Sequence, residues 1–328
     1  MLVVTGGAGF IGSNLVAGLE EAGLGPVVVC DRLGRGEKWR NLGKRALWDL
    51  IPPEELFRYL DRHAGEIDCV FHMGAVSETT ETDADLIVTN NFRLTLDLWE
   101  WCTRTATRLI YASSAATYGD GSAGFDDDPS PGALAALRPL NPYGWSKHLF
   151  DRRILQGGLT GSRRPRQWAG LKFFNVYGPN EYHKGEMRSL ACKMWPAIAA
   201  GEPARLFASD LPDYPDGGQM RDFVWVGDCV DVMLWLYEHP QVSGLFNLGT
   251  GHARTWNDLA TALSIAAGRP PAIEYVPMPD ILRGRYQYFT QARMDRLRAA
   301  GYTAPFTSLE AGVARYVRDY LATPDPYR

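Results

Sequence analysis

The sequence predicts an α/β fold: a Rossmann-type doubly wound parallel sheet with a smaller C-terminal α/β substrate-binding lobe. Short apolar runs alternate with longer helical patterns through the first two-thirds of the chain. A glycine-rich turn joins the first run to the first helical pattern. After Pro179 the alternation gives way to more prolines and longer loops. Because strand–helix alternation builds a parallel sheet with helices on both faces, these three observations together favour this class.

The predicted elements of the sheet follow one another in a regular order. Short β-rich runs predict strands at 2–5, 27–30, 69–73, 108–113 and 171–178. Helical patterns lie between them, near 13–22, 54–63, 84–104 and 142–156. A further strand and helix at 222–238 and a last strand at 245–251 are expected to return to the sheet.

This order predicts two units. The first is a dinucleotide-binding Rossmann domain, 1–178, with 222–251 returning to it. The second is a substrate-binding lobe made of 179–221 and 252–328, beside the carboxyl ends of the strands.

The composition excludes several classes of protein. With 328 residues, 45% apolar and 22% charged, the chain is an ordinary globular protein, and its net charge of −4 argues against nucleic-acid binding. Five scattered cysteines favour a reducing compartment and no metal site. The start "MLVVTGG" shows no signal peptide, and no uncharged run approaches the roughly 20 residues of a membrane span. We therefore expect a cytoplasmic protein that binds no membrane.

Two charged stretches are expected to be plain surface. "DDDP" at 126–129 is interpreted as a solvated loop, because nothing nearby supplies a regular set of metal ligands. "GSRRPRQ" at 161–167 is interpreted as an exposed basic loop.

The first turn has the spacing of a phosphate-binding motif. "VVTGGAGFIGSNL" places Gly6, Gly9 and Gly12 three residues apart, between a strand and a helix. Such glycines permit a tight turn and close approach to a pyrophosphate at the helix N-terminus. Asp31 ends the second strand, where an acid recognises the ribose, and this context favours a dinucleotide over a turn without a ligand.

The choice between NADP and NAD depends on the residues after the second strand. Asp31 alone favours NAD, because a carboxylate repels a 2′-phosphate. The basic residues that follow favour NADP, although they also suit a charged surface loop: Arg32, Arg35, Lys38, Arg40, Lys44 and Arg45. NADP is therefore the predicted cofactor, with NAD less favoured.

An acid–base pair is predicted on a later helix. Tyr143 and Lys147 are four residues apart and project from one helix face. A nearby ammonium and a positively charged nicotinamide are expected to lower the pKa of the tyrosine, so that it serves as a base. Ser114 ends an earlier strand and is placed to hydrogen-bond the substrate oxygen.

These motifs in this order resemble the extended short-chain dehydrogenase/reductases that modify nucleotide sugars. The matching stretches are "TGGAGFIGSN", "SSAATYG", "YGWSK", "FNVYGP", "RDFVWVGD" and "FNLGTG". A closer resemblance, over essentially the whole chain, is to the ADP-glyceromanno-heptose 6-epimerases. It is carried by "FHMGAVSETTE", "YHKGEMRSLACK", "LRGRYQYFTQA" and "LRAAGYTAPF".

The resemblance implies a precursor pathway for the lipopolysaccharide core, ADP-heptose as substrate, a retained NADP and a homo-oligomer, with a homopentamer expected. It implies cofactor contacts, beyond the three glycines and Asp31, from Phe10, Ile11, Arg32, Lys38, Met73, Gly74, Ala75, Val76, Ser77, Asn90, Tyr143, Lys147, Val176 and Lys184. It implies substrate contacts from Ser114, Asn175, Glu186, Lys193, Phe207, Ala208, Ser209, Asp210, Arg221 and Tyr286. No metal ligand is implied.

Lys184, in "HKGEM", is interpreted as a second acid/base. The resemblance implies oxidation of C6″ to a transient ketone, which turns over and is reduced from its other face. One group then serves the hydroxyl in each orientation, and Tyr143 and Lys184 are the candidates. The alternative is that Lys184 binds a pyrophosphate or stabilises its loop. His183 is interpreted as a spacer and His72 as a structural histidine.

Other interpretations stay open. Arg221 suits pyrophosphate binding, or it forms an ion pair with Asp222 or Asp228. A UDP-hexose 4-epimerase shares the scaffold but does not need Lys184. A 4,6-dehydratase is expected to carry an acidic pair where Ala115 and Ala116 follow Ser114. A silent NADP-sensing protein would be expected to lack the tyrosine or the lysine.

Overall fold

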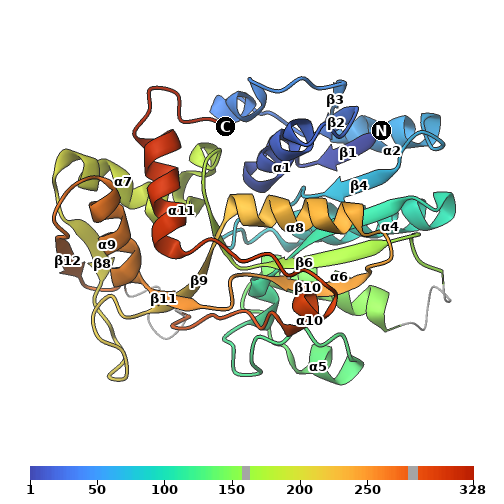
Figure 1. Ribbon diagram of the computed structural model, residues 1–328. Helices are drawn as coiled ribbons and strands as arrows, with labels where there is room; N and C mark the ends of the chain where they lie inside the picture. Colours follow the sequence, from blue (N-terminus) through green and yellow to red (C-terminus); the bar gives the residue numbers. More distant parts are fainter. Residues whose placement is uncertain (157–162, 280–286) are drawn as a thin grey trace.

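A seven-stranded sheet forms the centre of the protein (Figure 1). This computed structural model describes residues 1–156, 163–279 and 287–328. The strands lie in the order β10-β6-β5-β4-β1-β2-β3, and all neighbouring pairs are parallel. Their bounds are β1 (Leu2–Thr5), β2 (Val27–Cys30), β3 (Asp49–Ile51), β4 (Cys69–His72), β5 (Arg108–Ser114), β6 (Trp168–Phe173) and β10 (Gly244–Leu248). The predicted Rossmann-type sheet is confirmed.

The strand order reverses beside β1, which pairs with β2 on one side and β4 on the other. The chain builds outward through β2 to β3, then returns to β4 and builds outward through β5 and β6 to β10. In doubly wound sheets, ligands bind outside the carboxyl ends of the strands at such a reversal. The fold therefore predicts a ligand site at the carboxyl ends of β1 and β4.

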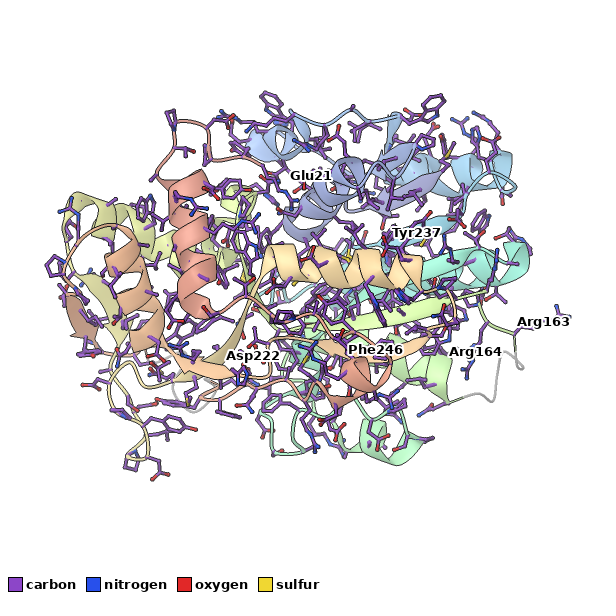
Figure 2. All side chains as sticks on the ribbon, viewed as in Figure 1. Glu21, Arg163, Arg164, Asp222, Tyr237 and Phe246 are labelled. Atoms are coloured by element: carbon purple, nitrogen blue, oxygen red, sulfur yellow. The ribbon has the colours of Figure 1, made fainter. Side chains whose placement is uncertain are left out.

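A second lobe contributes two small sheets, of order β11-β9-β7 and β12-β8. Their strands are β7 (Asn175–Tyr177), β8 (Ala204–Phe207), β9 (Met220–Trp225), β11 (Ala253–Thr255) and β12 (Ile273–Val276). The helices α7 (Leu190–Ala200), α9 (Trp256–Ala266) and α11 (Leu309–Tyr316), with the helical segment η7 (Val317–Leu321), complete the apolar core of this lobe. Asp222 on β9, labelled in Figure 2, accepts hydrogen bonds from the N–H groups of Gly251 (2.9 Å) and Ala292 (3.0 Å).

Two strand predictions were wrong in detail. The run 171–178 is divided at Phe174 into β6 of the large sheet and β7 of the small one. The strand expected to return to the large sheet at 222 is β9, which pairs with β7 and β11 instead. The reason is that β10 pairs with β6 and leaves no edge beside β6 for β9. The following helix and β10 do return as predicted.

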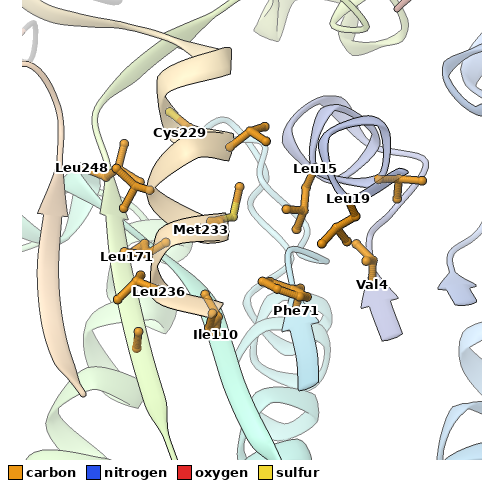
Figure 3. Packing of buried hydrophobic residues seen from close by; sticks show 14 of the residues in the cluster. Val4, Leu15, Leu19, Phe71, Ile110, Leu171, Cys229, Met233, Leu236 and Leu248 are labelled. Atoms are coloured by element: carbon orange, nitrogen blue, oxygen red, sulfur yellow. The ribbon is translucent and has the colours of Figure 1, made fainter. Parts of the chain in front are cut away.

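Helices cover both faces of the large sheet. On one face lie α1 (Phe10–Glu21) and α8 (Val226–Glu238), and on the other α2 (Leu56–Arg62), α4 (Leu94–Thr105) and α6 (Pro142–Leu155). Figure 3 shows Leu15 of α1 and Met233 of α8 packed over Val4 and Phe71. Val3 packs in the core on the opposite face, because successive strand side chains alternate. A strand buried on both faces needs the continuous apolar runs from which it was predicted.

The remaining short elements connect these layers. They are η1 (Glu37–Leu42), η2 (Pro53–Glu55), α3 (Ala84–Ile87), η3 (Val88–Arg93), η4 (Ala115–Tyr118), α5 (Pro131–Ala136), η5 (Tyr182–Met187) and α10 (Asp295–Ala299). Within the described ranges, no helix is long and apolar enough to cross a bilayer.

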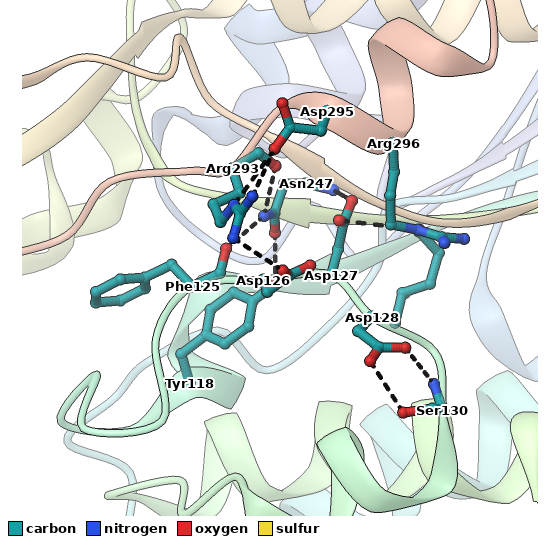
Figure 4. Close-up of polar contacts among 11 residues, drawn as sticks. Tyr118, Phe125, Asp126, Asp127, Asp128, Ser130, Asn247, Arg293, Asp295 and Arg296 are labelled. Atoms are coloured by element: carbon teal, nitrogen blue, oxygen red, sulfur yellow. Dashed lines mark hydrogen bonds and ion pairs between the residues drawn. The ribbon is translucent and has the colours of Figure 1, made fainter.

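The acidic stretch 126–129 differs from its prediction as a solvated loop. Asp127 is buried, and its carboxylate accepts a 2.7 Å hydrogen bond from the N–H of Asn247 on β10 (Figure 4). Tyr118 donates to the side chain of the same asparagine at 2.6 Å. Burial raises the pKa of Asp127 to about 6. The stretch therefore fastens the segment after β5 to the large sheet, with Asp126 and Asp128 left at the surface.

Candidate active site

A cavity of about 830 Å³ lies between the carboxyl ends of the large sheet and the second lobe. Its lining includes residues directly after β1, β2 and β4, residues of β5 and α6, and residues of η5, α7 and β8 of the second lobe. Twenty of the predicted site residues line it: Gly6, Gly9, Phe10, Ile11, Gly12, Asp31, Lys38, Met73, Gly74, Ala75, Val76, Ser77, Ser114, Tyr143, Lys147, Asn175, Val176, Lys184, Lys193 and Phe207. One cavity thus brings together groups up to about 200 positions apart in sequence.

Other predicted residues lie outside this lining: Arg32, Asn90, Glu186, Ala208, Ser209, Asp210 and Arg221. The Arg32 side chain is 61% exposed and pairs with Glu54. The Glu186 side chain is 92% exposed and pairs with Lys193 at 3.2 Å. Asn90 donates to the carbonyl oxygen of Leu86 one turn earlier. Tyr286 lies outside the described residues.

The glycine-rich turn has no room for side chains. Gly6 has a φ of +67°, and a Cβ there would lie 2.5 Å from the backbone of Gly74. A Cβ on Gly12 would lie 2.1 Å from the carbonyl oxygen of Gly6. These contacts bring the ends of β1 and β4 together and place the N-terminus of α1 at the cavity. Its N–H groups suit the phosphates of a dinucleotide.

Replacing Gly12 by alanine should lower the amount of bound dinucleotide in purified protein by at least about 10-fold, the equivalent of about 1.4 kcal/mol. The new methyl group would push the Gly6 carbonyl out of the turn. Gly65→Ala is the matched control, because a Cβ at Gly65 meets nothing within 4 Å. The measurement is the nucleotide content of each variant after denaturation. Normal content in Gly12→Ala would contradict a tight cradle.

The acid–base pair lies on the first two turns of α6. Asn141 caps this helix by accepting a 2.8 Å hydrogen bond from the N–H of Gly144. The side chain of Tyr143 lines the cavity. Burial raises its pKa, and a hydrogen bond with Ser114 opposes that rise. In the protein alone, desolvation of the ring outweighs this hydrogen bond. The predicted lowering, which includes the charge of a bound nicotinamide, stays a prediction. A lowered value would require additional positive charge in the cavity.

Lys147 has a buried ammonium with no hydrogen-bond partner among the described residues. Burial lowers its pKa to about 8, and Asp151 one turn later opposes the shift. A buried ammonium without acceptors is unfavourable, so this nitrogen is suited to a ligand that carries hydroxyl groups. Together with the glycine cradle, it fits a dinucleotide whose nicotinamide end lies beside Tyr143.

Asp31 lines the cavity beside the glycine-rich turn. Its carboxylate accepts hydrogen bonds from the N–H of Ala8 at 2.9 Å and from the Lys38 ammonium at 2.6 Å. Of the predicted basic run from Arg32 to Arg45, Lys38 is the member that lines the cavity. Arg45 instead pairs with Glu20 at 2.7 Å.

Lys184 approaches the cavity from η5, on a different element from Tyr143. Its ammonium lies 5.3 Å from the centroid of the Phe10 ring. Burial lowers the pKa of Lys184, and the buried Glu181 opposes this shift. A lowered pKa is the property that an acid/base lysine requires. The geometry thus places two ionisable side chains, Tyr143 and Lys184, on one cavity.

The sequence pattern that defines the NAD dependent epimerase/dehydratase family matches residues 2–249, well over half of the chain. The chain belongs to this family. A relative named ADP-L-glycero-D-manno-heptose-6-epimerase, from Nitratidesulfovibrio vulgaris strain DP4, is 54% identical, with all of both chains covered. The residues that line the cavity therefore belong to a fold family whose chemistry depends on a nicotinamide dinucleotide.

Two solved epimerase structures have the same fold as this chain. The Helicobacter pylori ADP-L-glycero-D-manno-heptose-6-epimerase superposes with a TM-score of 0.78 at 28% identity, covering 97% of this chain and 95% of that one. A Thermus thermophilus UDP-glucose 4-epimerase in complex with NAD superposes with a TM-score of 0.73 at 26% identity, covering 96% and 97%.

His72 and His183, the two histidines considered in the sequence, differ in their surroundings in this member of the epimerase/dehydratase family. His72 is fully buried between the hydroxyls of Thr5 (2.6 Å) and Thr95 (2.9 Å). Burial lowers its pKa to about 3, so it is a neutral structural histidine, as predicted. His183 lines the cavity, and burial together with Lys38 and Lys184 lowers its pKa to about 4.

Several residues of the site were missed from the sequence. Arg188, Arg205 and Trp256 line the cavity on the side of the second lobe. Isolated arginines, one just after a helical segment and one in a strand, carry no motif, and only the tertiary arrangement brings them together. Asn91 was also missed, although its neighbour was chosen. It is buried and exchanges hydrogen bonds with the backbone of Val76 at 2.8 and 2.9 Å, which holds the segment after β4 in place.

Arg221 lies next to the cavity. Its guanidinium is 5.5 Å from the ring of Trp256, and it donates to the carbonyl oxygen of Met220 at 2.8 Å. The carboxylate of Asp222 is engaged by backbone N–H groups, and that of Asp228 by Thr307 at 2.7 and 2.8 Å. Arg221 therefore packs against Trp256, which itself lines the cavity.

Proposed function

We propose that the protein is an ADP-L-glycero-D-manno-heptose 6-epimerase. It would invert C6″ of ADP-D-glycero-D-manno-heptose through a transient 6″ ketone, for synthesis of lipopolysaccharide core precursors. The observation that carries the proposal is that Tyr143 and Lys184 line one cavity from different elements, with the glycine cradle beside them. The full-length relative at 54% identity supports the same choice of substrate.

The side chains have separate tasks in this mechanism. Tyr143 removes the proton from the 6″ hydroxyl in one orientation of the sugar, and Ser114 hydrogen-bonds that oxygen. Lys147 keeps a positive charge near the phenolate and thereby stabilises it. Lys184 exchanges the proton in the other orientation. The glycine cradle and Lys147 would hold NADP, which would supply the hydride-transfer chemistry.

These roles distinguish a heptose 6-epimerase from a UDP-hexose 4-epimerase and from a 4,6-dehydratase. A UDP-hexose 4-epimerase has no need of Lys184 at the sugar. A 4,6-dehydratase needs acids near the serine at the end of β5, where this chain has Ala115 and Ala116 at the start of η4.

NADP is the cofactor that we propose, with NAD less favoured. Lys38 beside Asp31 supports it, because an ammonium at the ribose end favours a 2′-phosphate. Denatured protein should release NADP, and recovery of NAD alone would contradict this choice. During turnover the nicotinamide absorbance should show no net change, because the hydride returns to the same carbon. Accumulation of reduced cofactor in proportion to product would contradict the epimerase itself and indicate a dehydrogenase.

The larger unit, 1–178 with the returning segment, is proposed to bind the dinucleotide, and the lobe around β8 and α9 the nucleotide sugar. We also propose a homo-oligomer, with a pentamer expected from the family resemblance, which native mass measurement would test. Five buried cysteines, all present as thiols, support a place in the reducing cytoplasm.

A further inference from the structure

The turn that carries Lys184 is fastened to the glycine-rich turn by one side chain. Asn41, on η1, is buried and donates from Nδ2 to the carbonyl oxygen of Ala8 at 2.8 Å. The same nitrogen donates to the carbonyl oxygen of Asn180 at 3.0 Å. Ala8 lies within the dinucleotide cradle, and Asn180 lies just before η5. A single amide group therefore bridges the cofactor cradle and the base of the Lys184 turn.

His183 is a third acceptor for this amide. Its Nδ1 lies 3.2 Å from Nδ2 of Asn41. The lowered pKa of His183 keeps the ring neutral, so that Nδ1 is able to accept a hydrogen bond. Two amide hydrogens are thus shared among three acceptors, one of which is the residue directly before Lys184.

Asn180 adds a second fastening, to helix α1. It has a φ of +71°, which is unusual outside glycine, and it is fully buried. Its Nδ2 donates to the hydroxyl of Ser13 at 3.0 Å, and its Oδ1 accepts from the N–H of Arg328 at 3.0 Å. Asn14, on the same helix, donates to the carbonyl oxygen of Pro179 at 2.9 Å. The start of the turn is therefore held against the first two turns of α1.

The second lobe holds the turn from the other side. The buried Glu181 accepts hydrogen bonds from the hydroxyls of Ser189 (2.7 Å) and Tyr316 (3.1 Å). The backbone before Lys184 is consequently fixed to both units. Its ammonium remains over the Phe10 ring at the cavity.

We propose that Asn41 and Asn180 are positioning residues for Lys184. They hold its turn in register with the glycine cradle, so that the lysine reaches the reacting carbon from the side opposite Tyr143. The inference rests on the proposed function, because it concerns the acid/base role of Lys184. A displacement of about 1 Å at a reacting group is enough to cost up to about 10²-fold in rate.

The test uses the full-length enzyme with its retained cofactor and two variants, Asn41→Ala and Asn180→Gly. Glycine tolerates the positive φ of position 180, so that only the side-chain bonds are removed. Each variant should lower kcat for epimerisation of ADP-heptose by about 10-fold or more, with KM changed less than about 2-fold. Bound dinucleotide should be retained.

A second reaction separates positioning from general damage. With an analogue that carries an aldehyde at C6″, one molecule, as its hydrate, loses a hydride and becomes the carboxylate. A second molecule takes up that hydride and becomes the alcohol, so the dismutation consumes no external oxidant or reductant. Tyr143 suffices for it, and the rate should therefore stay within about 2-fold of wild type in both variants.

Gln167→Ala is the matched control. Gln167 is a buried amide whose Nε2 also donates to three carbonyl oxygens, those of Leu236, His239 and Val242. It precedes β6, at the end of the sheet away from the cavity. This variant should lower the melting temperature without lowering kcat.

The outcomes are distinct. Epimerisation at the normal rate in both variants, or an equal fall in epimerisation and dismutation, would overturn the positioning role. If Asn41→Ala does not fold, Asn180→Gly decides between the same outcomes. Wild-type protein that leaves ADP-heptose unchanged would instead refute the proposed function.

Discussion

Lys184→Met should lose epimerisation of ADP-heptose by at least about 10²-fold, the scale expected for a positioned acid/base. The variant retains most of the volume of the side chain but has no proton to exchange. Tyr143 remains, so dismutation of the 6″-aldehyde analogue should continue at a measurable rate. The measurement is the conversion of each substrate by the purified variant, followed by separation of the products.

Lys193→Met is the informative comparison for this experiment. Lys193 lines the same cavity, but its ammonium pairs with the exposed Glu186. Its loss should act mainly on KM, as expected for a group that binds the substrate and not the reacting atoms. If Lys184→Met also changed KM alone, Lys184 would be a phosphate or loop contact, and the two-base mechanism would be wrong.

Tyr143→Phe should lower epimerisation by at least about 10²-fold as well. One oxygen is removed from a ring that keeps its packing, so the fold should be unchanged. The appropriate control is Tyr177→Phe, because Tyr177 also lines the cavity and its buried hydroxyl has no partner among the described residues. The control should keep near-normal activity. Normal turnover in Tyr143→Phe would show that α6 does not carry the base.

The double variant Tyr143→Phe/Lys184→Met should lose dismutation as well as epimerisation. If one group of the pair serves each orientation of the sugar, removing both leaves no competent orientation. Residual dismutation equal to that of Lys184→Met would mean that a third group acts as the base.

The basic run after β2 shows the limit of prediction from neighbouring residues alone. The run predicted a phosphate site, but its side chains point in different directions. Lys38 faces the cavity, Arg32 pairs with Glu54, and Arg45 pairs with Glu20. Side-chain direction in an irregular loop depends on distant partners, and residue types along the chain do not reveal these.

The prediction that the acidic stretch at 126–129 is a solvated loop was wrong at Asp127 for the same reason. Asp127 is buried because Asn247 on β10 presents an N–H group to it, and the two are about 120 positions apart in sequence. Similarly, the apolar run 171–178 has no break that local propensity would detect. It divides at Phe174 because β6 and β7 pair with strands of different sheets.

By itself, the sequence determined the glycine cradle, the helical spacing of Tyr143 and Lys147, and the alternation that builds the parallel sheet. These features depend on contacts within a few residues or on the period of one element, so spacing is sufficient to predict them. Only the tertiary structure decided which groups share the cavity and in what state. Burial raises the pKa of Tyr143 and lowers that of Lys184, and Asn41 joins the cradle to the Lys184 turn across about 140 positions. Desolvation and long-range hydrogen bonds arise only when the whole chain has packed.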